Sequence, residues 1–186
     1  MSRALVIGGT RGIGLALSDR LRTLGWNVRS TGSAVDITDP MAWPEFLEEQ
    51  PYDLVVFSAG RLDVAPWGVK RLSDLLASYS LHAAAPVALL AAHGSKLLGW
   101  WSKVVFISTV GAVNSGAVDL GYGMAKAALE KAARALAEHS SWRVYLIRFD
   151  LVDTDMIRLL PGDTMDGRLA LSPAEAADQI IREAEL

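Results

Sequence analysis

Near its start the sequence reads Ala4-Leu-Val-Ile-Gly-Gly-Thr-Arg-Gly-Ile-Gly14. The four apolar residues predict a short buried strand, and the apolar spacing that follows the glycines predicts a helix. Gly8 suits a tight turn, Gly12 lets the backbone approach a pyrophosphate, and Gly14 lets the helix pack on the strand. The N-terminus of that helix offers unpaired N–H groups to phosphates. We therefore predict a dinucleotide phosphate loop. The alternative is a glycine-rich turn without a ligand, which the position between strand and helix disfavours.

The same alternation of apolar run and helical pattern continues along the chain. Strands are predicted at residues 4–7, 26–30, 53–57, 103–107 and 143–148, and helices at residues 13–24, 41–49, 73–92 and 124–138. Ser172-Pro173-Ala174-Glu175 predicts one more helix, with a capping box and proline at the first helical position. Several predicted strands are almost entirely apolar, as in parallel strands covered on both faces. The pattern predicts one α/β domain over residues 1–186, with a doubly wound parallel sheet between two helical layers.

The composition excludes several classes of protein. Of the 186 residues, 51% are hydrophobic and 21% are charged, as in globular proteins rather than disordered chains. The formal net charge of −3 argues against a nucleic-acid partner bound through excess cations. The absence of cysteine excludes disulfide scaffolds, thiolate zinc sites and cysteine nucleophiles. The three histidines are too scattered in the sequence to predict a metal site.

No segment has the pattern of a targeting or membrane-spanning sequence. The longest uncharged apolar run, residues 83–92, is half the length needed to cross a bilayer and contains Pro86. Residues 4–7 are followed directly by glycines, so they do not form the apolar core of a signal peptide. We expect a cytoplasmic protein with no membrane partner.

Further motifs follow the glycine loop in a fixed order. They are Val35-Asp36-Ile37-Thr38, Ser58-Ala59-Gly60, Ile107-Ser108-Thr109, Tyr122-x-x-x-Lys126 and Leu151-Val-Asp-Thr-Asp-Met156. This order resembles the short-chain dehydrogenase/reductase (SDR) family over nearly the whole chain. The resemblance implies a Rossmann-type fold, and hydride transfer between a nicotinamide cofactor and a carbonyl or alcohol substrate. It also implies a compact member that lacks the last strand of the family. This member is shortened around the third strand, because only residues 33–35 separate the end of the second predicted strand from Asp36.

The residues after the second predicted strand bear on the choice of cofactor. NAD-preferring dinucleotide folds place an acid there to hold the ribose 2′-hydroxyl, and residues 29–33 contain no carboxylate. Gly32 stands where the resemblance would place that acid, and Arg11 lies within the phosphate loop. We therefore expect NADP(H) rather than NAD(H), with a solvated surface role for Arg11 as the alternative. By resemblance Asp36 would accept from the adenine amino group, and an Asx-turn is its local alternative.

The cofactor contacts that the loop and the resemblance imply are Gly8, Thr10, Arg11, Gly12, Ile13, Gly14, Ser33, Asp36, Ile37, Ser58, Ala59, Gly60, Tyr122, Lys126, Val152 and Thr154. In the family, the backbone of Val152 and the hydroxyl of Thr154 would hold the nicotinamide carboxamide. Phe149-Asp150 stand where the family usually has Pro-Gly, which is a departure from its pattern. The alternative role of Thr154 is to cap a short helix.

Tyr122 and Lys126 are four residues apart, so both project from one face of the predicted helix. A phenol with a pKa near ~10 is a poor acid at neutral pH, and an adjacent ammonium stabilises the phenolate. Tyr122 can then serve as the general acid and base. By resemblance, Lys126 also holds the nicotinamide ribose. A hydroxyl thirteen residues before the tyrosine binds the substrate oxygen in the family, which gives Thr109, with Ser108 as the fallback.

His82 stands where the family has a catalytic asparagine whose carbonyl holds a water. Pro86 has no N–H, so the carbonyl of His82 loses its helical partner and is expected to bind that water. The alternative is an ordinary helix residue beside a proline kink. Residues 155–172 predict a short lid with hinges at Pro161-Gly162 and Gly167, hence an open pocket. The resemblance also implies a homodimer through the helices at 73–92 and 124–138. A non-catalytic NADPH sensor on the same fold remains the alternative function.

Overall fold

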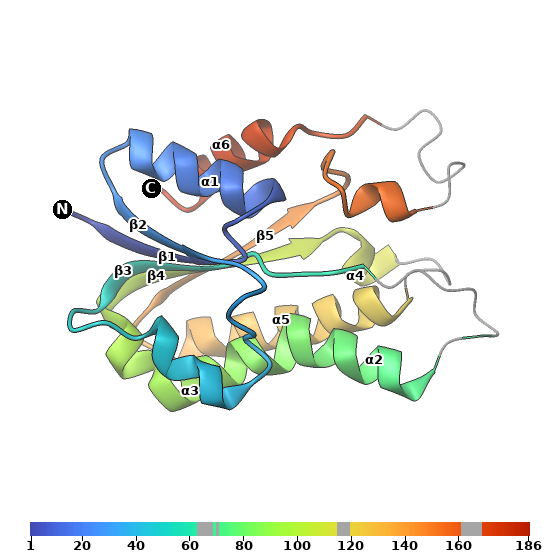
Figure 1. Ribbon diagram of the computed structural model, residues 1–186, viewed down its shortest axis with the longest axis horizontal. Helices are drawn as coiled ribbons and strands as arrows, with labels where there is room; N and C mark the ends of the chain where they lie inside the picture. The colour runs from blue at the N-terminus through green and yellow to red at the C-terminus, as the bar shows by residue number, and fades with distance from the viewer. Residues whose placement is uncertain (63–68, 70, 115–119, 161–168) are drawn as a thin grey trace.

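The computed structural model describes residues 1–62, 69, 71–114, 120–160 and 169–186. Five parallel strands form one sheet in the order β2-β1-β3-β4-β5 (Figure 1). Their bounds are β1 Arg3–Ile7, β2 Asn27–Thr31, β3 Tyr52–Phe57, β4 Leu98–Thr109 and β5 Arg143–Phe149. All five predicted strands are confirmed, and the order is that of a doubly wound Rossmann-type sheet.

Helices cover both faces of this sheet (Figure 1). One face carries α1 (Gly12–Thr23) and α6 (Pro173–Glu183), and the other carries α2 (Leu72–Tyr79), α3 (Ala85–Leu97) and α5 (Leu120–His139). Successive side chains of β1 alternate between two apolar clusters, with Val6 in the cluster beneath α1 and Ile7 in the cluster beneath α3. Residues 4–7 are all buried, as predicted for a strand covered on both faces. The predicted three-layer α/β architecture is therefore confirmed.

The segment between β2 and β3 is shorter than a helix and strand would need. Residues 32–51 contain no strand, and their one helical element is η1 (Pro40–Phe46), a 3-10 helix. The prediction of an α-helix at residues 41–49 is therefore wrong. Pro44 lies inside that segment and removes a backbone donor, so an α-helical ladder cannot form through it. Trp43 and Phe46 still fill the core beneath this segment.

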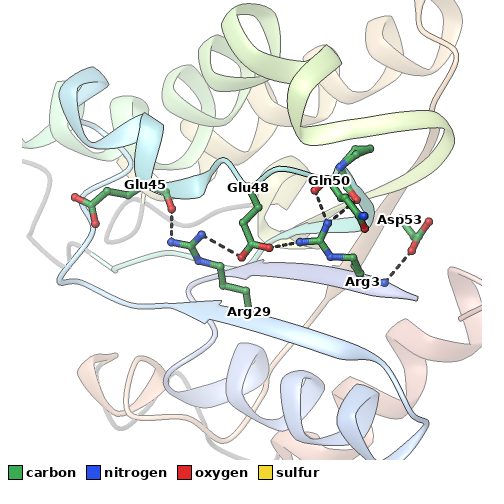
Figure 2. Close-up of polar contacts among 7 residues, drawn as sticks. Arg3, Arg29, Glu45, Glu48, Gln50 and Asp53 are labelled. Carbon is green, nitrogen blue, oxygen red and sulfur yellow. Dashed lines mark hydrogen bonds and ion pairs between the residues drawn. The ribbon is translucent and has the colours of Figure 1, made fainter. Parts of the chain in front are cut away.

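Charged side chains fasten the segment after η1 to the sheet (Figure 2). Glu48 receives Arg3 of β1 on one carboxylate oxygen and Arg29 of β2 on the other. Arg29 also donates to the carbonyl oxygen of Glu45, and the backbone N–H of Arg3 donates to Asp53 at 2.8 Å. In the described part of the chain β2 forms one edge of the sheet. These contacts therefore cover an edge strand with side chains rather than with a further strand.

The continuous helical stretch Leu72–Leu97 is long and apolar enough to cross a membrane, judged by length and composition alone, with a mean hydropathy of 1.6. In the structure it comprises α2, the π-helical turn η3 (Ser80–Ala84) and α3. Leu89, Leu90 and Leu97 lie in the core cluster beneath the sheet. The apolar character of this stretch thus provides a face that packs on strands.

Candidate active site

The phosphate loop packs tightly against the two neighbouring strand ends. Gly8 has a φ of 89°, and a Cβ there would lie 2.3 Å from the backbone nitrogen of Ala59. A Cβ on Gly14 would lie 2.2 Å from the carbonyl oxygen of Gly8. Larger residues at either position would push the loop away from its neighbours. The positive φ of Gly8 and the close packing of Gly14 thus agree with the tight turn and the helix packing that the sequence predicts.

The first turn of α1 is open to an anion. Arg11 is its N-cap residue, in extended conformation, and the described structure gives it no side-chain cap hydrogen bond. The described first turn also contains no acidic side chain. Gly12 follows with a φ of 53°, and the side chain of Ile13 packs against the core beside α1. Exposed Arg11 and the first N–H groups of α1 therefore form a positive surface at the carboxyl edge of the sheet.

The end of β2 has little room for an acidic side chain. A Cβ on Gly32 would lie 2.4 Å from the hydroxyl oxygen of Thr10. Asp36, further along, accepts from the backbone N–H and the hydroxyl of Thr38, both at 2.8 Å, so the Asx-turn forms. Ser33 is exposed, whereas the side chain of Ile37 is buried in the core. Any contact of Ile37 with a ligand would therefore be through its backbone.

The segment after β3 runs between the phosphate loop and the opposite helical layer. The backbone N–H of Ser58 donates to the carbonyl oxygen of Ile7 at 2.8 Å. The Ser58 hydroxyl lies 3.0 Å from where a Cβ on Gly14 would be. Ala59 is partly buried against the core, and a Cβ on Gly60 would lie 2.8 Å from Cε1 of His82. Residues 58–60 thus reach from the phosphate loop to the helical layer that carries the predicted catalytic residues.

Tyr122 and Lys126 lie together in α5, with the ammonium 5.6 Å from the centre of the phenol ring. Nζ of Lys126 also donates to the carbonyl oxygen of Ile107 at 2.7 Å, and the side chain is buried. Burial lowers the pKa of Lys126 to about 8, and the nearby carboxylate of Glu130 opposes that shift. At neutral pH the lysine is still mostly charged, so it can stabilise a phenolate.

The two candidate hydroxyls at the end of β4 differ in their partners. The hydroxyl of Ser108 donates to Glu130 at 2.8 Å and is buried. The hydroxyl oxygen of Thr109 accepts from the backbone N–H of Gly111 at 3.1 Å and is only partly buried. Accepting this bond leaves the proton of Thr109 available to a substrate oxygen. The hydroxyl of Thr109 thus caps the loop after β4, which is the alternative role of a hydroxyl at a strand end, whereas the hydroxyl of Ser108 is committed to the carboxylate. The choice of Thr109 over Ser108 as the substrate-binding hydroxyl stays a prediction.

An ion pair beside Lys126, between buried Glu130 and partly exposed Arg148, is not predicted by the sequence motifs. Glu130 lies one turn beyond Lys126, and both of its carboxylate oxygens receive Arg148 of β5, at 2.7 and 2.5 Å. These hydrogen bonds hold the pKa of Glu130 below its usual range, although burial opposes them. The spacing of Tyr122, Lys126 and Glu130 at intervals of four was the available signal. Arg148 could not be found in this way, because it reaches Glu130 only through the register of β5 in the sheet.

His82 lies in η3, and its ring meets that of Tyr122 edge-on at 4.9 Å between centres. Here the helix widens to π geometry, with the N–H of Ala85 donating to the carbonyl oxygen of Ser80. Pro86 accounts for this widening because it cannot donate an α-helical bond. The imidazole is buried, and burial together with the charge of Lys126 lowers its pKa to about 3. His82 is therefore neutral at physiological pH.

The segment after β5 returns to the phosphate loop. Val152 is buried and bridges in parallel to Leu171, and a methyl group of Thr154 lies 3.2 Å from where a Cβ on Gly12 would be. The carbonyl oxygen of Thr154 also accepts from Ile157, the first residue of η4 (Ile157–Leu159). The predicted hinges Pro161-Gly162 and Gly167 lie outside the described residues. Among those described, no group of three or more His, Asp or Glu side chains could hold a metal ion.

These loops gather at the carboxyl ends of the strands, where ligands bind in open α/β sheets. A model of the NAD dependent epimerase/dehydratase family matches residues 4–152, most of the chain. The chain belongs to the NAD dependent epimerase/dehydratase family. This membership agrees with the resemblance to SDR proteins that the sequence motifs indicate, because solved structures of SDR proteins share the fold of this chain. No curated protein sequence matches this member of the epimerase/dehydratase family.

Three solved structures illustrate the likeness. A short chain dehydrogenase/reductase family protein superposes with a TM-score of 0.85 at 22% identity, covering 98% of this chain and 89% of that one. BdcA in complex with NADPH gives 0.86 at 22% identity, with coverages of 98% and 86%. The angucycline C-6 ketoreductase LanV with bound NADP gives 0.84 at 18% identity, with coverages of 99% and 89%. At these identities the likeness shows a shared fold.

Proposed function

We propose that this protein is an NADP(H)-dependent oxidoreductase of the SDR type, which transfers hydride between the nicotinamide and a carbonyl or alcohol substrate. The observation that carries the proposal is the buried ammonium of Lys126, 5.6 Å from the phenol ring of Tyr122, at the sheet edge that also holds the phosphate loop. Burying a cation costs free energy, and buried titratable groups with perturbed pKa values cluster at functional sites. Stabilising a phenolate during proton transfer is such a use.

The residues fit a dinucleotide. The open first turn of α1, together with Arg11, suits the phosphates, and the close packing of Gly8 and Gly14 holds the loop against the ends of the strands. When bound, NADP(H) would supply or accept the hydride. Tyr122 would donate a proton to the carbonyl oxygen or remove it from the alcohol, and Lys126 would stabilise the phenolate between these steps. Thr109 would hold the substrate oxygen by a hydrogen bond.

The preference for NADP(H) over NAD(H) rests on charge and space. Thr10 occupies the volume that a side chain on Gly32 would need, and Arg11 is exposed beside it in the loop. An arginine suits a 2′-phosphate, whereas an acid would repel one. Two of the compared structures, BdcA and LanV, hold NADPH and NADP respectively. The alternative is NAD(H) without recognition of the 2′ position.

The first test is titration of the purified protein with NADPH and NADH, followed by energy transfer from its six tryptophans to the nicotinamide. We expect clear preference for NADPH. Equal or tighter NADH binding would overturn the cofactor assignment alone. Binding of neither would overturn the proposed function, since no hydride carrier would remain.

A carbonyl screen with the Tyr122→Phe variant then separates enzyme from sensor. We expect turnover to fall about 100- to 10,000-fold while the NADPH affinity stays unchanged, because the phenol proton is removed and little else. Tyr79→Phe is the control, since Tyr79 is a half-exposed tyrosine in α2. Turnover retained in Tyr122→Phe would contradict the catalytic role. The alternative, a non-catalytic NADPH sensor, is favoured by Phe149-Asp150 at the carboxamide segment and predicts NADPH binding without turnover in the wild type.

A further inference from the structure

One imidazole touches two parts of the candidate site. The ring of His82 meets Tyr122 edge-on, with 4.9 Å between ring centres and an interplanar angle of 90°. Its Nε2 atom lies 2.8 Å from the carbonyl oxygen of Arg61, at the end of the segment that follows β3. His82 thus joins the predicted proton donor on α5 to residues 58–61, three of which are predicted cofactor contacts.

The backbone on both sides is shaped to admit this ring. The π-helical turn at Ser80–Ala84 carries His82 into the interior, and π turns recur at functional sites. On the other side Gly60 has no side chain, and a Cβ there would approach Cε1 of His82 to 2.8 Å. A methyl group in that place would force the imidazole to move. The fit therefore depends on the turn and on Gly60 together.

The contacts with Arg61 favour one tautomer. Nε2 of His82 lies 2.8 Å from the carbonyl oxygen of Arg61 and 3.4 Å from its backbone N–H, and the shorter contact is made when Nε2 carries the proton and Nδ1 presents a lone pair. Nδ1 is buried and has no hydrogen-bond partner among the described residues. The ring is thus held by one hydrogen bond at one end and by packing on Tyr122 and Gly60 elsewhere. A buried neutral imidazole whose polar contacts among the described residues are all with the backbone of Arg61 is suited to holding a position rather than to moving protons.

We propose that His82 is a positioning residue, which fixes the phenol ring of Tyr122 relative to residues 58–61 and thereby aligns the proton donor with a dinucleotide bound there. This inference rests on the proposed function, because the alignment matters only if Tyr122 transfers a proton. It assigns the role to the imidazole itself, in addition to the expectation that the main-chain carbonyl of His82 holds a water. Misplacing a reacting group by about 1 Å can cost about 100-fold in rate.

Two substitutions of His82 separate its contact with Tyr122 from its contact with Arg61. His82→Phe keeps an aromatic edge toward Tyr122 and loses the hydrogen bond to Arg61, whereas His82→Gln keeps a donor and loses the ring. We expect kcat to fall about 10- to 100-fold in each, with the NADPH dissociation constant unchanged within about twofold. A merely space-filling imidazole would be replaced by phenylalanine without loss of kcat. Full kcat in His82→Phe would therefore overturn the inference.

The matched control is His93→Phe. His93 lies in the next helical segment, meets Trp43 edge-on at 6.0 Å, and also has a buried Nδ1 without a partner among the described residues. Eleven residues of helix place it roughly 16 Å from His82. We expect this variant to change stability and leave kcat unaltered. An equal fall in kcat in both variants would show a general effect of losing a buried histidine and overturn the specific role.

A second measurement does not depend on turnover. In ¹⁵N spectra of the wild type, His82 is expected as the Nε2–H tautomer and to stay neutral at pH 5. In ¹³C–¹H spectra of the aromatic side chains, Gly60→Ala is expected to shift the ring resonances of both His82 and Tyr122. An unmoved Tyr122 would overturn the coupling. If the wild type turns over no carbonyl while these resonances move together, the proposed function fails and the packing stands. If the wild type is active and His82→Phe equals it, the positioning role alone fails.

Discussion

Lys126 fastens α5 to the end of β4, because its ammonium donates a 2.7 Å hydrogen bond to the carbonyl oxygen of Ile107. This bond occupies one of the three protons of the ammonium and leaves the others for ligands. Strand and helix are held together at the same atom that, in the proposed function, would stabilise a phenolate of Tyr122. The position of this charge is therefore set by the sheet as well as by the helix.

We expect carbonyl reduction to fall as the pH rises through about 8, where burial places the pKa of Lys126. Above that pH the ammonium is lost, and the phenolate loses its stabilising charge. The measurement is the pH profile of kcat/KM. The activity that Lys126→Arg retains should persist to higher pH than that of the wild type. Lys131→Arg, an exposed lysine on the same helix, should leave the profile unchanged. A profile flat to pH 10 would contradict this prediction.

The same residue affects stability. The pKa of Lys126 is lower in the folded chain than in the unfolded one, so the unfolded chain binds more protons between about pH 8 and the ordinary lysine pKa of 10.5. The contribution of this group to stability therefore rises with pH across that window. We expect Lys126→Met to remove this rise and to be more stable than the wild type at pH 7, since it buries no charge. Urea unfolding at pH 7 and pH 10 measures both effects.

Cofactor choice is expected to depend on Arg11. Arg11→Ala should weaken NADPH binding about 10- to 100-fold and leave NADH binding nearly unchanged, because a charge-assisted hydrogen bond is worth about 1.5–3 kcal/mol. Arg20→Ala is the control, since Arg20 lies elsewhere on α1 and pairs with Asp178 of α6. Equal losses for both nucleotides would indicate a general electrostatic effect.

The Gly32→Asp variant alone should bind NADH poorly, because Thr10 fills the space that the new side chain needs. The double variant Gly32→Asp, Thr10→Gly should relieve this conflict.

The pair of Glu130 and Arg148 is expected to stabilise the fold. Arg148→Met leaves a buried carboxylate with the hydroxyl of Ser108 and the guanidinium of Arg134, 3.9 Å away, as its remaining partners. We expect this to cost about 2 kcal/mol, below the cost for a fully buried pair because Arg148 is partly exposed. Since the pKa of Glu130 is held below its usual range, its contribution is present above pH 4.5 and is lost as the pH falls further. Arg148→Met should therefore show a weaker acid dependence of its unfolding midpoint. An unchanged acid dependence would contradict this account.

A homodimer through α2 and α5 is expected from exposed apolar side chains. Leu72, Leu76 and Tyr79 are exposed along one side of α2, and Met124 is exposed on the neighbouring α5. Leu76→Glu should convert the protein to a monomer in light scattering after gel filtration. Leu24→Glu, at an equally exposed leucine after α1, should not. A wild-type monomer at micromolar concentration would contradict the expected assembly.

The parts of the fold that depend on local pattern could be predicted from the sequence. The loop at Gly8 to Gly14 and the pairing of Tyr122 with Lys126 follow from short spacings, which local geometry fixes. The 3-10 segment at Pro40–Phe46 was mistaken for an α-helix, because its apolar spacing outweighed the effect of Pro44. The contacts of Glu130 with Arg148 could not be predicted, because they depend on how β5 registers beside β4 and faces α5. The edge contact of His82 likewise depends on a π turn that no local pattern specifies.

The carboxylate that joins Arg3 to Arg29 determines how the outer strand is protected from other chains. Where a further strand would cover the backbone groups of β2, this protein relies on ion pairs, and ion pairs near a surface weaken as salt is added. An uncovered strand edge is a template for pairing with another molecule. We therefore expect high ionic strength to favour aggregation that begins at β2, and low-salt buffers to keep the protein in solution better.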